Sequence, residues 1–204
     1  RLRSHWEISV AKQPFFYTWL TLSSHEPFET PLQTVITGDD DPSKFLNSLH
    51  YTDEVLYSFV QECKKQPWWN NTVLMIVADH GHRMPATGKK IDDFKIPLLM
   101  LGGGINAEVI DKTGSQTDVA ATLLSRTGIS GREFTWSKNL TDSLAKPSAY
   151  FCFNNGFGFV NGTGYFIFDN MGKMVMEQSP DADPTILNTG KAIQQLSFQD
   201  YLER

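Results

Sequence analysis

TVLMIVADHGHRMP, residues 72–85, joins six consecutive apolar residues (73–78) to an Asp-His-Gly turn. A short β-branched run of this kind predicts a strand that is buried on both faces, as in a parallel sheet covered by helices. In open α/β sheets, ligands bind at the carboxyl ends of strands, which is where this turn falls. Gly81 would let the chain turn sharply and bring its backbone close to whatever Asp79 and His80 hold.

The Asp79-His80 pair has two interpretations. A carboxylate and an imidazole together suit a divalent cation that accepts mixed oxygen and nitrogen ligands. The same two residues also fit a simple turn, in which Asp79 caps the following backbone and His80 is solvated. The pair by itself leaves both open, so the surrounding chain has to decide between them.

A second histidine follows a second predicted strand. Residues 15–22, FFYTWLTL, are aromatic and β-branched, which predicts a buried strand, and His25 lies just beyond its end. If this strand lies in the same parallel sheet, His25 faces the same edge as Asp79 and is a candidate to hold an anionic substrate oxygen. The alternative is an exposed loop histidine.

The middle of the chain alternates helices with strands. Asp41 offers an N-cap, with Pro42 at the first position, for a helix that runs to Lys65. IPLLML, residues 96–101, predicts another strand, and the segment SQTD, residues 115–118, caps a further helix that ends at a glycine. The order predicts an α/β fold with a mostly parallel central sheet flanked by helices.

The last third has a different pattern. Short aromatic segments separated by Asn-Gly and Gly-Thr-Gly turns predict an antiparallel meander between Tyr150 and Met176, and the spacing of apolar residues predicts a helix over 184–202. Asn154 and Asn155 fit either a plain loop or the rim of a site. We therefore expect an α/β domain over residues 1–146 and a small sheet-plus-helix subdomain over 147–204.

Composition excludes several classes of protein. The 204 residues carry a net charge of −5, and no basic run is present, which argues against a nucleic-acid partner. Cys63 and Cys152 form neither a disulfide framework nor a metal-type spacing. No apolar stretch approaches the ~20 residues of a membrane span. Because the chain begins at Arg1 without Met, we interpret it as a piece of something longer.

Five segments in this order resemble the sulfatase and alkaline-phosphatase superfamily: SSHEPFETP, YTDEVLYSFV, TVLMIVADHGHR, KIPLLMLGGG and SQTDVAATLLSRTGI. The His-x-Pro-Phe motif at residues 25–28 and FNNGFGFV at 153–160 resemble its lipoteichoic-acid-synthase-like branch. The resemblance covers roughly residues 13 to 170. It implies an alkaline-phosphatase-like fold, incomplete in this piece, with a small antiparallel sheet and a C-terminal helix after the main sheet.

The resemblance also implies an activity and roles for particular residues. Members use a nucleophile on a divalent metal to attack a phosphate or sulfate ester, which here implies cleavage or transfer, by phosphoglycerol transfer or by sulfuric ester hydrolysis. Asp79 and His80 match two metal ligands, and His25 matches a histidine that binds the phosphoryl or sulfuryl group. His82 and Arg83 follow the metal pair as weaker substrate-binding candidates. The metal is one divalent ion, with Mn²⁺ favoured over Mg²⁺, Ca²⁺ or Zn²⁺.

The nucleophile and the other acidic ligands of the family have no counterpart in this sequence. Neither Cys63 nor Cys152 fits the Cys-x-Pro/Ser-x-Arg pattern that formylglycine formation needs. We therefore expect the nucleophile to lie outside this piece, in a missing N-terminal half of the domain. The piece alone should bind metal poorly, have negligible esterase activity and, because open sheet edges attract other strands, be prone to self-association.

The resemblance places the parent protein on the extracytoplasmic face of the cell envelope, anchored in a membrane, with a lipid head group among the candidate substrates. A different class of function stays open: a binding or assembly module that keeps the fold without the chemistry. In that case Asp79 and His80 would be relic turn residues.

Overall fold

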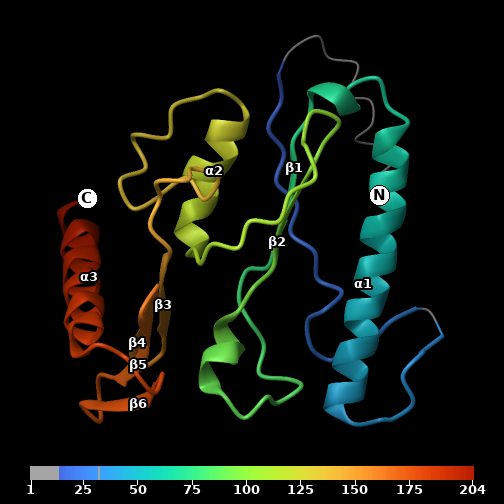
Figure 1. Cartoon of the computed structure of the whole chain (residues 1–204). Helices are drawn as coiled ribbons and strands as arrows, with labels where there is room; N and C mark the ends of the chain where they lie inside the picture. The colour runs from blue at the N-terminus through green and yellow to red at the C-terminus, as the bar shows by residue number, and fades with distance from the viewer. Residues whose placement is uncertain (1–13, 32) are drawn as a thin grey trace. The chain divides into compact units, whose positions relative to one another are not determined.

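The computed structural model describes residues 14–31 and 33–204, which form two compact units (Figure 1). The first unit ends at Thr72 and also includes Gly102–Gly104. The second unit comprises Val73–Leu101 and Ile105–Arg204. The domain boundary predicted at residue 146 stays a prediction.

The first unit is built on helix α1 (Asp41–Lys64), which is followed by the single turn η2 (Trp69–Asn71). The side chain of Asp40 caps α1, because its Oδ1 accepts a hydrogen bond from Ser43 N at 2.9 Å. The cap is therefore one residue earlier than the predicted Asp41. The helix itself was predicted from Pro42 in its first turn and its apolar stripe.

The predicted strand at residues 15–22 is wrong. Within the described part of the chain these residues have no strand partner, and the side chains of Phe16, Leu20 and Leu22 are 80%, 71% and 71% exposed. Aromatic and β-branched residues favour an extended backbone, but a strand also needs a neighbour for its backbone hydrogen bonds. Among residues 14–31 and 33–204, no strand lies beside this segment to supply that neighbour.

The second unit begins with β1 (Leu74–Val77) and β2 (Leu98–Leu101), the two strands predicted on either side of the Asp-His-Gly turn. They pair antiparallel, with Leu74 opposite Leu101 and Val77 opposite Leu98. The predicted mostly parallel central sheet is therefore not what the described residues form. Residues 78–97, which join the strands, contain one short helical turn instead of a crossover helix, so the chain returns in the opposite direction.

The strand β1 is also less buried than predicted, since its four residues are half-buried or exposed. Val77 and Leu98 lie on the face that turns toward α2 (Val119–Arg126), whereas Leu99 on the other face is 50% exposed. The apolar run predicted a strand that is buried on both faces, whereas β1 packs on one face only.

The connections between the strands and α2 contain two short helical turns, η3 (Lys90–Phe94) and η4 (Gln116–Asp118). The second of them, η4, leads directly into α2. Ser115 and Asp118 form the predicted capping box: the Asp118 carboxylate accepts from Ser115 N at 2.8 Å. Gly128 ends α2 at a φ of 73°, a left-handed conformation that glycine adopts without strain.

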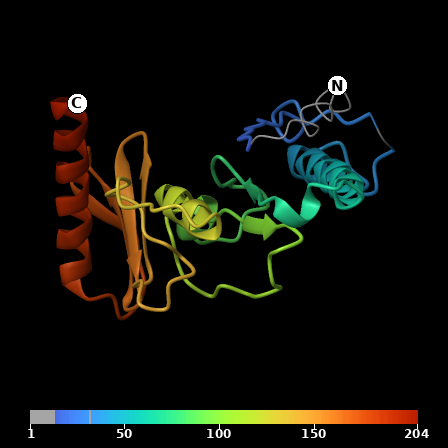
Figure 2. The same ribbon diagram turned by 90° about the horizontal axis from the view of Figure 1, so that it is seen from above.

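The last third forms the predicted antiparallel meander. Its strands, in the spatial order β3-β4-β5-β6, are β3 (Ser148–Phe153), β4 (Gly156–Asn161), β5 (Gly164–Asp169) and β6 (Met174–Gln178). Helix α3 (Pro184–Glu203) follows and lies along the sheet, with α2 on the other side of the sheet (Figure 2). Both the meander and the C-terminal helix were predicted correctly.

The face of the sheet under α3 is aromatic. Phe159 and Phe166 pair across β4 and β5 and pack with Ile186 of α3 in the core of this unit. Gly190 lets the helix approach closely, because a Cβ at this position would lie 2.6 Å from Phe157 Cε2 and 3.0 Å from Phe159 Cβ. The glycine therefore fixes where α3 can sit on the sheet.

The opposite face of the sheet holds η3. The ring of Phe94 stacks on Phe151 of β3 with 4.1 Å between centroids. The carboxylate of Glu177 on β6 accepts hydrogen bonds from Lys90 N at 2.7 Å and from Ile91 N at 3.1 Å. The connection that follows the Asp-His-Gly turn is therefore tied to the small sheet.

Candidate metal and anion site

The two residues predicted as metal ligands lie together at the end of β1. Asp79 Oδ2 and His80 Nε2 are 3.6 Å apart, and Asp79 Oδ1 accepts a hydrogen bond from His80 N at 3.0 Å. Their side chains are 71% and 73% exposed. The pair thus presents an oxygen and a nitrogen side by side to solvent.

The hydrogen bond at the other ring nitrogen sets the tautomer of His80. His80 Nδ1 lies 2.8 Å from the carbonyl oxygen of Gly81, which can only accept, so Nδ1 carries the proton. In the tautomer that this contact favours, the free ring nitrogen is Nε2, on the side of Asp79. A backbone carbonyl that orients an imidazole ring in this way is also common at metal-binding histidines.

The separation of the two donor atoms fits a shared cation. Two ligands at about 2.1 Å from an ion lie roughly 3.0–3.6 Å apart for angles between 90° and 120°. The 3.6 Å between Asp79 Oδ2 and His80 Nε2 falls at the upper end of that range. Among the described residues no group of three or more His, Cys, Asp or Glu side chains is placed to hold a metal, so the pair fits part of a site.

Gln116 fixes the backbone that carries this pair. Its Nε2 donates to the carbonyl oxygens of Ala78 at 2.9 Å and Asp79 at 2.8 Å. The neighbouring Ser115 hydroxyl is held in turn by β3, since it accepts from Tyr150 N at 2.7 Å and lies 3.1 Å from Tyr150 O. The SQTD pattern predicted only a helix cap for this segment, although the carboxamide of Gln116 beside the cap was an available signal.

Gly81 is required because the backbone of η3 leaves no room for a side chain at this position, in addition to the sharp turn that the sequence predicted. A Cβ at this position would lie 2.2 Å from the carbonyl oxygen of Asp93 at the end of η3. The turn after His80 therefore packs directly on the backbone of η3. The carboxylate of Glu177 accepts hydrogen bonds from the first two backbone N–H groups of the same η3 turn. Glu177 is a second residue that sequence analysis did not connect with the site.

His82 and Arg83 do not join the pair in any contact of the described residues. His82 Nδ1 accepts a hydrogen bond from Met84 N at 3.1 Å, which gives this half-buried ring a role in the turn. Arg83 is exposed. Their substrate-binding roles stay predictions.

His25 belongs to the first unit, whereas Asp79 and His80 belong to the second. It is exposed in a turn, with Nδ1 2.9 Å from the carbonyl oxygen of Glu26. The turn is held to α1 by a hydrogen bond of 2.9 Å between the hydroxyls of Ser24 and Thr52, and by buried Phe28 packing on Phe45. The predicted role of His25 at an anion stays a prediction.

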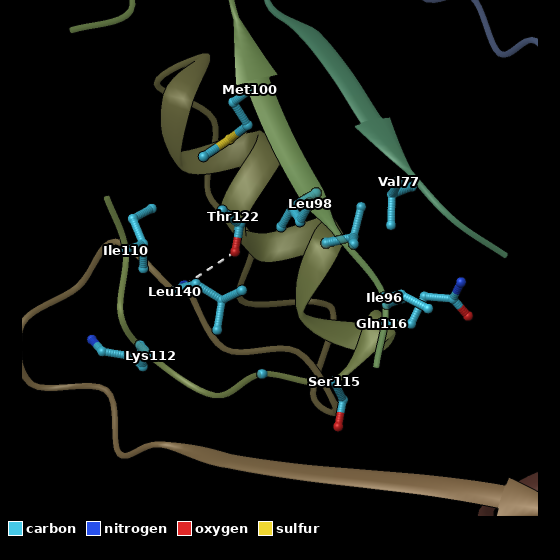
Figure 3. A pocket seen from close by; sticks show the side chains of 12 residues that line it. Val77, Ile96, Leu98, Met100, Ile110, Lys112, Ser115, Gln116, Thr122 and Leu140 are labelled. Carbon is cyan, nitrogen blue, oxygen red and sulfur yellow. Dashed lines mark hydrogen bonds between the residues drawn. The ribbon is translucent and has the colours of Figure 1, made fainter. Parts of the chain in front are cut away.

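A cavity of about 230 Å³ adjoins the strand end within the second unit (Figure 3). Leu98 and Met100 of β2 line it together with Thr122 of α2 and Leu140, and the backbone N of Leu140 donates to Thr122 Oγ1 at 3.0 Å. Gln116 lines the same cavity. Since its walls are mostly apolar, the cavity adds no further ligand to Asp79 and His80.

Comparison with known proteins identifies the family. The sequence model of the sulfatase family matches residues 5–129, which include His25, Asp79, His80 and Gln116. This chain belongs to the sulfatase family. The resemblance read from its motifs is therefore correct.

Curated relatives of this sulfatase-family chain are lipoteichoic acid synthases. Lipoteichoic acid synthase 1 of Bacillus subtilis is 30% identical over 164 residues, which cover 68% of this chain and 26% of the relative. A lipoteichoic acid synthase of Staphylococcus saprophyticus is 29% identical over 199 residues, which cover 85% of this chain and 30% of the relative. The chain thus spans between a quarter and a third of these relatives.

Solved structures show the same fold. A protein in the alkaline phosphatase superfamily from Vibrio parahaemolyticus superposes with a TM-score of 0.83 at 24% identity, over 98% of this chain and 52% of that one. A lipoteichoic acid synthase from Listeria monocytogenes gives 0.59 at 18% identity, over 88% and 52%. The sulfatase-family chain therefore has an alkaline-phosphatase-like fold. In its described residues, no helix is long and apolar enough to cross a membrane.

Proposed function

We propose that the protein is a metal-dependent enzyme that cleaves or transfers a phosphate or sulfate ester, with phosphoglycerol transfer favoured over sulfate-ester hydrolysis. The observation that carries this proposal is the convergence of Asp79 Oδ2 and His80 Nε2 at 3.6 Å, with the ring held by Gly81 O. Family membership and the names of the relatives support the reaction class.

Each residue has a proposed role at the ester. Asp79 and His80 hold one divalent ion, Mn²⁺ by preference, which would act as Lewis acid and template for the ester oxygen. His25, when protonated, offsets negative charge that grows on the transferred group. The nucleophile and the remaining ligands come from outside this piece. The guanidinium of Arg83 and the imidazole of His82 are weaker candidates for contacts with the substrate.

The proposed setting follows the relatives. A lipid head group is the favoured ester substrate, and the parent protein acts at the extracytoplasmic face of the cell envelope with a membrane anchor. The remainder of the catalytic domain is the main partner of this piece. Without it, the unpaired edges of β1 and β2 make self-association of the piece the expected behaviour.

Asp79→Asn in the full-length parent tests the proposal, because it removes the ligand charge while keeping the size of the side chain. We expect turnover to fall by at least about 100-fold and the melting temperature to stay unchanged. Asp111→Asn is the matched control, since Asp111 is an exposed loop aspartate and its change removes the same charge.

The competing proposal is a binding or assembly module that kept the fold without the chemistry. It is favoured by the absence of a three-ligand group among the described residues. No change in any activity of the Asp79→Asn parent would support the module and reject the enzyme. An equal loss in Asp111→Asn would reject the ligand role of Asp79.

A further inference from the structure

A second cavity, of about 200 Å³, opens at the end of the small sheet. The β3–β4 turn, the β5–β6 turn and helix α3 each contribute to its walls. The lining residues are Cys152, Phe153, Asn154, Asn155, Gly156, Asn170, Met171, Gln194 and Phe198. All of them belong to the second unit and none is among the candidate ester-site residues.

Carboxamide residues from three segments line this cavity. The two turns are joined by a backbone hydrogen bond of 2.7 Å from Asn170 N to Asn155 O, which holds the turns side by side. In the described part of the chain, the side-chain amides of Asn154, Asn155 and Asn170 make no hydrogen bond. Each can donate and accept at once, which is the pairing that a hydroxyl group needs.

Helix α3 supplies the opposite wall. Residues 186, 190, 194 and 198 are four apart and share one helix face. Ile186 and Gly190 are buried on the sheet, but Gln194 is half-buried and Phe198 is 62% exposed. The helix face that packs the core therefore continues past the aromatic sheet and brings Gln194, whose amide bonds Tyr150, and Phe198 to the wall of the cavity.

The lining of the cavity is uncharged and mostly apolar, with a few polar groups. None of the described residues that line it is Asp, Glu, Lys, Arg or His. Burial, followed by the nearby Cys152 thiol, raises the pKa of the adjacent Tyr150, so that phenol also stays neutral at pH 7. A phosphate or sulfate group would find no cation here, whereas a neutral ligand leaves no charge unpaired.

The volume limits the size of the ligand. At about 200 Å³ the cavity is below the roughly 300 Å³ at which sites for drug-sized ligands begin. We propose that it binds a neutral polyhydroxyl group the size of one sugar ring or one glycerol unit, with the Asn154, Asn155 and Asn170 amides on the hydroxyls and the Phe198 ring against the carbon skeleton. This site is independent of the ester chemistry proposed above.

Cys152 provides a reporter for the site. Its thiol lines the cavity and is exposed, whereas Cys63 is 2% exposed and burial raises the pKa of its thiol. An alkylating reagent therefore reacts first at Cys152. A ligand in the cavity should slow that reaction, because only the unoccupied protein reacts.

The experiment measures the rate of iodoacetamide alkylation of Cys152 in the whole chain by mass spectrometry, with D-glucose or glycerol as the probe. Glutathione in the same solutions corrects for effects of the probe on the reagent. We expect a saturable decrease, to about one third of the starting rate at a probe concentration of twice the Kd. Comparison of the two probes separates a sugar-ring site from a glycerol site.

Two cavity variants, one control variant and one anion complete the test. Phe198→Ala and Asn154→Ala should each weaken protection by at least about threefold. Leu202→Ala, an 80% exposed residue on the same helix that does not line the cavity, should leave it unchanged. Unprotected alkylation with both probes, stronger protection by glycerol 3-phosphate than by glycerol, or equal loss in Leu202→Ala would each overturn the proposal.

Discussion

The carboxamide nitrogen of Gln116 lies 2.8 Å from the backbone carbonyl oxygen of Asp79, and the same nitrogen reaches Ala78 O at 2.9 Å. One side chain from η4 therefore holds the two peptide groups that lead into the candidate ligand pair. Orientation at a metal or catalytic site is sensitive to such supports, because small displacements of a reacting group reduce turnover strongly.

Gln116→Glu removes both donated hydrogen bonds while keeping the size of the side chain. In the full-length parent we expect activity to fall between about 10- and 100-fold, with a stability loss of about 1–2 kcal/mol. Turnover and melting temperature are measured together. Thr117→Ala, an exposed neighbour in the same turn, is the control. An equal loss in both variants would show that the turn matters only for folding.

Glu177→Gln tests the tie between β6 and η3. Burial raises the pKa of Glu177, but hydrogen bonds from Lys90 N, Ile91 N and the Tyr165 hydroxyl outweigh it, so the pKa lies below its ordinary 4.5. The ionised carboxylate therefore stabilises the fold above that ordinary pKa, and the stabilisation is lost as pH falls through the folded-state pKa.

At pH 7 we expect Glu177→Gln to lower the free energy of unfolding by about 1–2 kcal/mol, because one of the two acceptor oxygens becomes a donor. The difference from wild type should shrink below the ordinary pKa of a carboxyl group, as seen in urea unfolding over a series of pH values. A difference that does not change with pH would contradict an ionic origin.

Asp118→Asn probes the buried cap of α2. The Asp118 carboxylate is 3% exposed and accepts from Ser115 N, Lys138 N and Lys138 Nζ, and Lys138 is 26% exposed. Neutralising it leaves the ammonium of Lys138 without its counter-charge, so we expect a loss of about 3 kcal/mol in urea unfolding. Asp111→Asn, at an exposed position, should change stability by less than about 0.5 kcal/mol.

The 204-residue chain alone should bind Mn²⁺ only weakly, with a Kd above about 100 μM, because two protein ligands rarely hold a divalent ion firmly. It should also show negligible ester hydrolysis. Isothermal titration with Mn²⁺ measures the first, with Asp79→Asn as the blank. Micromolar binding that disappears in the blank would mean that the piece holds a more complete site than we propose.

Local patterns in the sequence were sufficient for much of the fold. The apolar stripe of α1, the capping box at Ser115 and the Asn-Gly turn after Phe153 each depend on neighbours a few residues away, and all three form as predicted. The predictions of a parallel sheet and of a strand at residues 15–22 were wrong, because they depended on which segments pair. The sequence of one segment does not show which other segment it pairs with.

The candidate site divides in the same way. The proximity of Asp79 and His80 could be predicted because they are adjacent in sequence at a strand end. Gln116 and Glu177 were missed because their contacts span 37 and 87 residues of chain. The place of His25 is also a question of long-range arrangement, so its role rests on the family pattern.

Gly190 limits where substitutions on α3 can be made. Since any Cβ there meets Phe157 and Phe159, the helix can neither slide by one residue nor rotate without moving those rings. Gln194 and Phe198, one and two turns onward, therefore occupy positions along the sheet that are set by a residue with no side chain of its own. Substitutions at Gln194 and Phe198 that leave Gly190 in place can therefore change the chemistry of this helix face. They should not change the spacing between α3 and the β3–β4 and β5–β6 turns.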